Sequence, residues 1–106
     1  MIKKRPSSNI QRLRLKKQHE VCTVLCQWFP KCFLKPQQVV YLKPLKRDIH
    51  RDVFQAIDHQ SLPLTKTQVR RFFRWYTQQP AYQRALLKGH PRVNLEGKVV
   101  EVIAKD

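Results

Sequence analysis

The chain of 106 residues contains only two glycines and seven acidic residues, and both scarcities restrict what it can do. Two glycines leave no room for a glycine-rich phosphate-binding loop. His50, His59 and His90 form no pattern with serine, cysteine or carboxylate residues, so nothing in the sequence resembles a catalytic constellation. We therefore expect a protein that is not an enzyme and that needs no cofactor.

Long apolar runs are also absent. No segment approaches the ~18 consecutive apolar residues that indicate a membrane-spanning helix. The basic N-terminus, residues 1–6, is not followed by the apolar core of a signal peptide. The cysteine count of three agrees with this, because a small secreted scaffold usually carries an even set. We expect a cytoplasmic protein with no membrane partner.

The cysteines raise the question of a metal site. Cys22 and Cys26 lie one helical turn apart, with His19 and Cys32 nearby in the sequence. Thiolate and imidazole are zinc ligands, but this spacing matches no common structural zinc site. Buried free thiols explain the pattern more simply, and we predict no bound metal.

Cations, by contrast, are abundant. The 22 Lys and Arg residues give the chain a formal net charge of +15. This excess indicates an anionic partner and leaves the fold undetermined. The apolar fraction of 42% is sufficient for the core of one small domain.

The spacing of apolar residues predicts a first helix that begins near Ile10, with Asn9 as a suitable N-cap. Pro30 ends this helix. A second helix is expected over about residues 47–58. The residues that precede the first helix, 1–9, read as a flexible basic arm.

A third helix should begin after Thr65, because Thr65 and Gln68 match a capping box. Pro80 suits the first turn of a fourth helix, and Gly89 suits its end. Residues 92–103 alternate in polarity on both sides of a turn, as in a β-hairpin. The expected core positions of the third helix are Val69, Phe72, Phe73 and Tyr76.

These elements predict a mainly α (α+β) fold. We expect residues 10–106 to form a single monomeric domain, a compact bundle of about four to five helices closed by a small C-terminal β-hairpin.

The third helix carries the clearest functional signal. Lys66, Arg70 and Arg74 recur every four residues and should project as one stripe. No Asp or Glu occurs between His59 and Leu95, so no acid nearby in sequence neutralises the stripe. Like charges at this spacing repel, and a fold usually tolerates that cost where a polyanion binds. An ordinary solvated helix face is the competing interpretation.

Other residues add to this signal with less weight. Lys46 and Arg47 lie at the expected start of the second helix, where free backbone N–H groups attract anions, although a solvated turn explains them equally well. Tyr82 follows a break in the chain and is a better candidate for ligand contact than Tyr76, which shares the core stripe. Trp75 lies away from the apolar arc and fits either a core or a ligand-contact role.

Five short motifs, in this order and spacing, resemble those of ProQ/FinO-domain proteins: Phe29-Pro30-Lys31-Cys32-Phe33, Lys43-Pro44-Leu45-Lys46, Leu64-Thr65-Lys66-Thr67-Gln68-Val69-Arg70, Arg74-Trp75-Tyr76-Thr77 and Pro91-Arg92-Val93-Asn94-Leu95-Glu96-Gly97. The resemblance covers about residues 20–100 and implies a ProQ/FinO-like fold and a bacterial RNA chaperone. Such domains bind structured RNA, notably terminator hairpins with a single-stranded 3′ tail, and support small-RNA or antisense regulation.

Charge pattern and resemblance together give one expected RNA-binding set: Lys46, Arg47, Thr65, Lys66, Arg70, Arg71, Arg74, Tyr82 and Arg92. The weight on Arg92 comes from the resemblance alone. Two other classes stay open: a DNA-binding helix-turn-helix protein that uses residues 65–77 as its recognition helix, and a basic protein-interaction module, for example on the ribosome.

Overall fold

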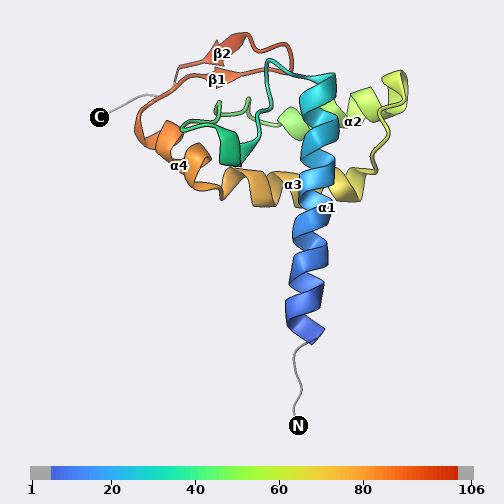
Figure 1. Cartoon of the computed structure of the whole chain (residues 1–106). Coiled ribbons are helices and arrows are strands. Elements are labelled where there is room, and N and C mark those ends of the chain that lie inside the picture. Colours follow the sequence, from blue (N-terminus) through green and yellow to red (C-terminus); the bar gives the residue numbers. More distant parts are fainter. Residues whose placement is uncertain (1–5, 103–106) are drawn as a thin grey trace.

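The structure, a computed structural model, describes residues 6–102. Its elements, shown in Figure 1, are α1 (Pro6–Trp28), a 3-10 helix η1 (Pro36–Gln38), α2 (Ile49–Gln60), α3 (Lys66–Thr77), α4 (Pro80–Leu87), β1 (Arg92–Val93) and β2 (Val99–Glu101). Four α-helices and a small antiparallel sheet confirm the predicted mainly α architecture with a C-terminal hairpin.

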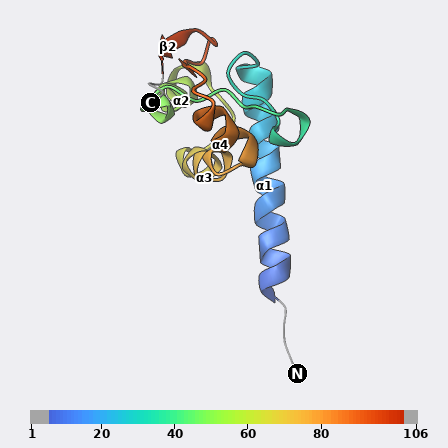
Figure 2. The same cartoon turned by 90° about the vertical axis from the view of Figure 1, so that its left-hand side faces the viewer.

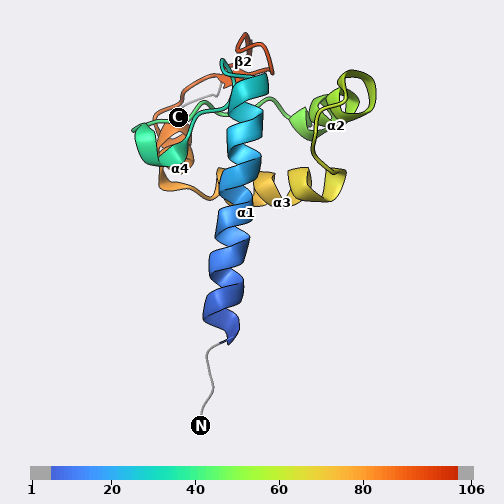
Figure 3. The same ribbon diagram turned by 45° about the vertical axis from the view of Figure 1, so that its right-hand side comes forward.

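Helix α1 is longer than expected. It begins at Pro6, four residues before the start predicted at Ile10, so residues 6–9 are helical and only residues 1–5 of the expected arm lie outside the described part of the chain. Proline is tolerated in the first turn of a helix, and no breaker follows before Ile10. The N-terminal half of α1 projects away from the other elements (Figures 1 and 3). Its C-terminal half packs against the core.

Helix α3 lies across α1 and contacts α1, α2 and α4. Of its predicted core positions, Val69, Phe72 and Tyr76 have no exposed surface, whereas Phe73 is half-buried and packs against the core from outside. Phe33 packs edge-on against both Phe72 and Tyr76, with ring centroids 5.9 and 5.7 Å apart. The backbone N–H of Leu34 donates a hydrogen bond to the Tyr76 hydroxyl at 3.2 Å. The loop after α1 is thereby fastened to the buried face of α3.

The ends of the helices follow local sequence signals. The capping box is present at α3: Thr65 Oγ1 accepts from the Gln68 N–H at 3.1 Å, and Gln68 Oε1 accepts from the Thr65 N–H at 2.9 Å. Helix α4 has Pro80 in its first turn and is followed by Gly89 at φ +75°, as predicted. Helix α2 starts at Ile49, two residues later than expected, because the preceding Asp48 adopts a left-handed conformation.

The C-terminal hairpin is shorter than the alternating pattern suggested. Its strands pair with an irregular register, and Asn94 Oδ1 accepts from two N–H groups across the turn. The segment before α2 joins the hairpin, since the N–H of Lys46 donates to the carbonyl of Val93 at 2.9 Å and a parallel bridge links Leu45 to Val93. This pairing brings Lys46 beside Arg92, which follows it by 46 positions in the sequence.

Candidate nucleic-acid interface

Two grooves flank α3, and each contains basic residues that were predicted from the sequence. The first, which we call the Arg70 groove, has a volume of about 470 Å³ and lies among the segment before α2, the start of α2, α3, α4 and β1. Its lining residues with polar or charged side chains are Lys46, Asp48, His50, Arg70, Thr77, Tyr82 and Arg92. Four of the nine predicted residues therefore meet in one cavity.

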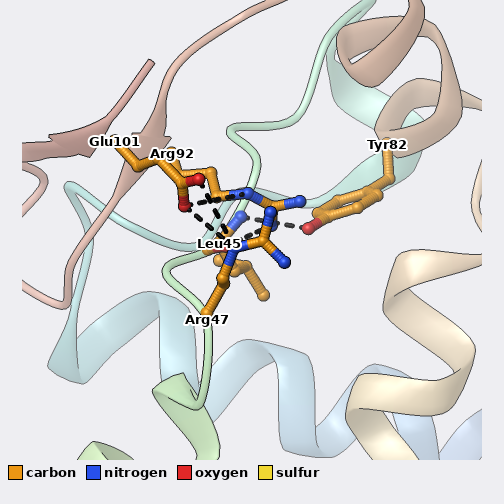
Figure 4. A network of polar contacts seen from close by, with 5 residues as sticks. All are labelled: Leu45, Arg47, Tyr82, Arg92 and Glu101. Atoms are coloured by element: carbon orange, nitrogen blue, oxygen red, sulfur yellow. Dashed lines mark hydrogen bonds and ion pairs between the residues drawn. The ribbon is translucent and has the colours of Figure 1, made fainter. Parts of the chain in front are cut away.

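A polar network holds one wall of the Arg70 groove (Figure 4). The backbone N–H of Leu45 donates to the Tyr82 hydroxyl at 3.0 Å, and Arg92 Nη1 donates to the carbonyl of Leu45 at 2.8 Å. Glu101 is shared by two arginines, with Oε1 at 3.1 Å from Arg47 Nε and 3.6 Å from Arg92 Nε. The backbone of Leu45 thus fixes the positions of both Tyr82 and Arg92.

Tyr82, predicted from the sequence as a candidate for ligand contact, is more buried than that role suggested. Only 4% of its surface is exposed, and its ring packs against that of Tyr76 with centroids 6.0 Å apart. The buried ring leaves no free face for stacking. The hydroxyl oxygen accepts from Leu45, which leaves the hydroxyl hydrogen free to donate to another group.

The cations of this region differ in how far carboxylates neutralise them. Lys46 Nζ lies 2.8 Å from Asp52, and Lys66 Nζ lies 3.5 Å from Asp58. The Lys66 pair corrects the expectation that the stripe has no acidic partner, because the turn between α2 and α3 brings Asp58 next to it. Arg70 has no carboxylate partner within residues 6–102 and lies over the Phe54 ring at 5.3 Å. Arg70 is therefore well placed to attract an anion.

The second groove, which we call the Arg71 groove, has a volume of about 560 Å³ and lies between α1 and α3. It is lined by Arg14, Leu15, Gln18, Arg71, Arg74, Trp75 and Gln78. The predicted stripe is thus divided, with Arg74 on this side of α3 and Arg70 on the other. The reason is geometric, since positions four residues apart on an α-helix are rotated by about 40° and the stripe drifts around the axis.

Thr65 lies near a smaller hollow of about 320 Å³ that adjoins the Arg71 groove. Arg14, Gln18 and Arg71 line both cavities, and Lys17 adds a cation to the smaller one. The side chain and backbone N–H of Thr65 are both used in the capping box. The predicted RNA contact of Thr65 stays a prediction, and it has to be compatible with the capping box that already engages these groups.

Sequence reasoning missed the contribution of α1. Gln18 and Arg14 continue the stripe of buried residues Val21 and Leu25 toward the N-terminus at helical spacing. Extending the helical stripe from Val21 toward the N-terminus would have indicated that Gln18 and Arg14 face α3. Without this step the four cations of residues 12–17 could not be assigned to a face of the helix.

Of the three free cysteines, Cys22 and Cys32 are buried and Cys26 is half-buried. Cys22 and Cys26 have their Sγ atoms 3.9 Å apart, and the hydrogen bond between them lowers the pKa of Cys26 and raises that of Cys22. Burial raises the pKa of Cys32 to about 12. Among residues 6–102 no group of three or more His, Cys, Asp or Glu side chains is arranged to hold a metal ion. Over the same residues, no helix is both long and apolar enough to cross a membrane.

Several known proteins are similar to this chain in sequence. The chain is 31% identical over 93 residues to the RNA chaperone ProQ of Vibrio vulnificus strain CMCP6 and to that of Idiomarina loihiensis, matches that cover 88% of this chain and 43% of each relative. It is 33% identical over 84 residues to the RNA chaperone ProQ of Aliivibrio salmonicida, which covers 79% of this chain and 38% of that protein. The chain thus spans less than half the length of these relatives. A family model described as ProQ/FINO family matches residues 15–106, nearly the whole described domain, and the chain therefore belongs to the ProQ/FinO family.

Proposed function

We propose that this chain is an RNA-binding chaperone domain that takes an RNA hairpin with a single-stranded 3′ tail as its ligand, in small-RNA or antisense regulation. Family membership, relatives named RNA chaperone and a net charge of +15 support RNA as the partner. The observation that carries the proposal is the convergence of Lys46, Arg70, Tyr82 and Arg92 from four separate segments on the Arg70 groove.

The chemistry of the Arg70 groove fits an RNA strand end. The guanidinium of Arg70 can form two parallel hydrogen bonds to a phosphate. The Tyr82 hydroxyl has a hydrogen to donate to a phosphate or ribose oxygen. Asp48, also in the lining, can accept from a ribose hydroxyl, which DNA lacks at the 2′ position. Basic donors together with one carboxylate therefore suit RNA better than DNA.

The position of α3 also favours RNA over the helix-turn-helix alternative. A recognition helix must enter the major groove of a duplex, which is about 12 Å wide. Here α3 is recessed, with α1 and α2 packed against it, and its arginines line cavities between helices. Figure 2, which views α3 nearly end-on, shows α1 beside it. This arrangement suits a strand that enters the protein.

Competition binding tests the proposal with three ligands: an RNA hairpin with a free 3′ tail, the same RNA with a 3′ phosphate, and a DNA duplex of matched length. We expect preference for the first, and Tyr82→Phe, which removes the hydroxyl and with it the hydrogen bond accepted from Leu45, should reduce that preference. The matched control is Tyr41→Phe, because Tyr41 is half-buried outside the Arg70 groove. Equal binding of all three ligands would refute reading of the 3′ end, and tightest binding of the DNA duplex would refute RNA as the partner.

A further inference from the structure

We propose that the Arg71 groove is a second RNA site, which binds a single-stranded segment while the Arg70 groove holds the first RNA. The inference rests on the proposed function, since it assumes that the domain binds RNA. It would allow one domain to hold two RNA segments at once, one on each flank of α3.

Charge is the first argument. The Arg71 groove and its adjoining hollow are lined by four cations, Arg14, Lys17, Arg71 and Arg74, and by no acidic residue. None of these cations has a carboxylate partner within the described chain, residues 6–102. The Arg70 groove is less positive, because Asp48 lines it and its Lys46 is paired. By charge, the Arg71 groove is therefore at least as suitable for an RNA phosphate backbone as the Arg70 groove.

An unsatisfied acceptor is the second argument. Gln18 Oε1 is buried and has no hydrogen-bond partner, although Gln18 lines both the groove and the adjoining hollow. A buried acceptor left without a donor costs about 1–3 kcal/mol. A turn of the half-buried Gln18 side chain would bring this amide to the groove surface, where a ribose hydroxyl or a base N–H, but not a phosphate, can donate to it. The ligand is thus expected to carry anionic groups and hydrogen-bond donors together, as a ribonucleotide does.

Trp75 is the reason to expect a single-stranded RNA segment in the Arg71 groove. Its indole packs edge-on with the His19 ring and at a tilt with the Phe72 ring, at centroid distances of 5.2 and 5.9 Å, and the residue also lines the groove. Aromatic side chains in basic grooves stack on unpaired bases, a contact worth about 1–3 kcal/mol per base. A duplex hides the faces of its bases and cannot use this surface.

The two grooves are separate enough for simultaneous occupation. Their linings share no residue. Arg70 and Arg71 are consecutive in α3 and therefore point about 100° apart around the helix axis. The body of α3, anchored by Phe72 and Tyr76 in the core, lies between them. A ligand in one groove consequently leaves the other open.

Tryptophan fluorescence tests occupancy of the Arg71 groove directly. The chain has two tryptophans, and Trp28→Phe leaves Trp75 as the only one. We expect a short unstructured RNA to quench Trp75 and Arg14→Glu with Arg71→Glu to abolish the quenching. The matched control reverses two arginines outside both grooves, Arg12→Glu with Arg51→Glu, and should retain most of it. Binding of the short RNA without any change in Trp75 emission would overturn the assignment.

A two-ligand experiment tests independence. With the hairpin RNA at saturation, a labelled short RNA should still bind and give a complex containing both, measured by anisotropy and native mass spectrometry. Relative to the control pair, Arg14→Glu with Arg71→Glu should weaken binding of the short RNA by about tenfold or more. Binding of the hairpin should weaken by less than about twofold. Stoichiometric displacement of the short RNA by the hairpin would overturn the second site and leave the proposed function intact. Failure of the hairpin itself to bind would instead refute the proposed function.

Discussion

Replacing Arg70 by alanine is the sharpest test of the Arg70 groove. The side chain is exposed, has no carboxylate partner within residues 6–102, and contacts the Phe54 ring at 5.3 Å. Loss of this cation–π contact should lower the free energy of unfolding by about 0.5–1 kcal/mol, leaving the fold intact. Loss of a charge-assisted contact to phosphate should cost about 1.5–3 kcal/mol of binding, or roughly 10- to 150-fold in Kd.

The assay is a hairpin RNA titration at a series of salt concentrations. Arg70→Ala should reduce the slope of log K against log salt by about 0.7–0.9, one phosphate contact. Arg51→Ala is the control, because it removes the same charge from an exposed position on α2 outside both grooves. Equal effects of the two substitutions would mean that only net charge matters, and the reasoning from the groove would be refuted.

Three further predictions concern stability. Thr65→Ala removes the N-cap of α3 and should cost about 1 kcal/mol, measured as a shift in the urea midpoint, whereas Thr65→Ser should cost little. Gly97→Ala places a Cβ 2.7 Å from the Lys31 carbonyl oxygen at φ +81°, and should cost about 1–3 kcal/mol in the same assay; an unchanged midpoint would contradict this. Burial raises the pKa of Cys32 to about 12 and also raises that of Tyr76, so both ionise in the unfolded chain first. Unfolding free energy should fall above about pH 9 through Cys32 and above about pH 10 through Tyr76, by up to about 1.4 kcal/mol per pH unit for each group, with a smaller slope in Cys32→Ala.

The start and the buried face of α3 could be predicted from the sequence because the signals for both are local. Thr65 and Gln68 are three residues apart, and the capping box they form depends only on that spacing. The buried positions Val69, Phe72 and Tyr76 follow the helical period. For the same reason the fourth helix was correctly predicted to start at Pro80. Each of these features depends on neighbours within about one helical turn or two.

The division of the site into two grooves was not predictable in this way. It depends on which helices pack on each side of α3, and the contacts of α1 and α2 with α3 join residues far apart in sequence. The pairing of Lys66 with Asp58 and the burial of Tyr82 arise from the same tertiary packing. A helical wheel predicts the direction of a side chain around the helix axis. The residues that the side chain meets belong to other parts of the chain and cannot be read from the wheel.

The arrangement of α3 couples the two grooves to one core. In the run Val69-Arg70-Arg71-Phe72, two buried residues enclose two exposed arginines that line different cavities. Rotation or translation of α3 would therefore move both arginines together. Because Val69 and Phe72 are fully buried and interiors are closely packed, such movement is resisted by the core. Repulsion between these like charges therefore acts against a helix that core packing already holds in place.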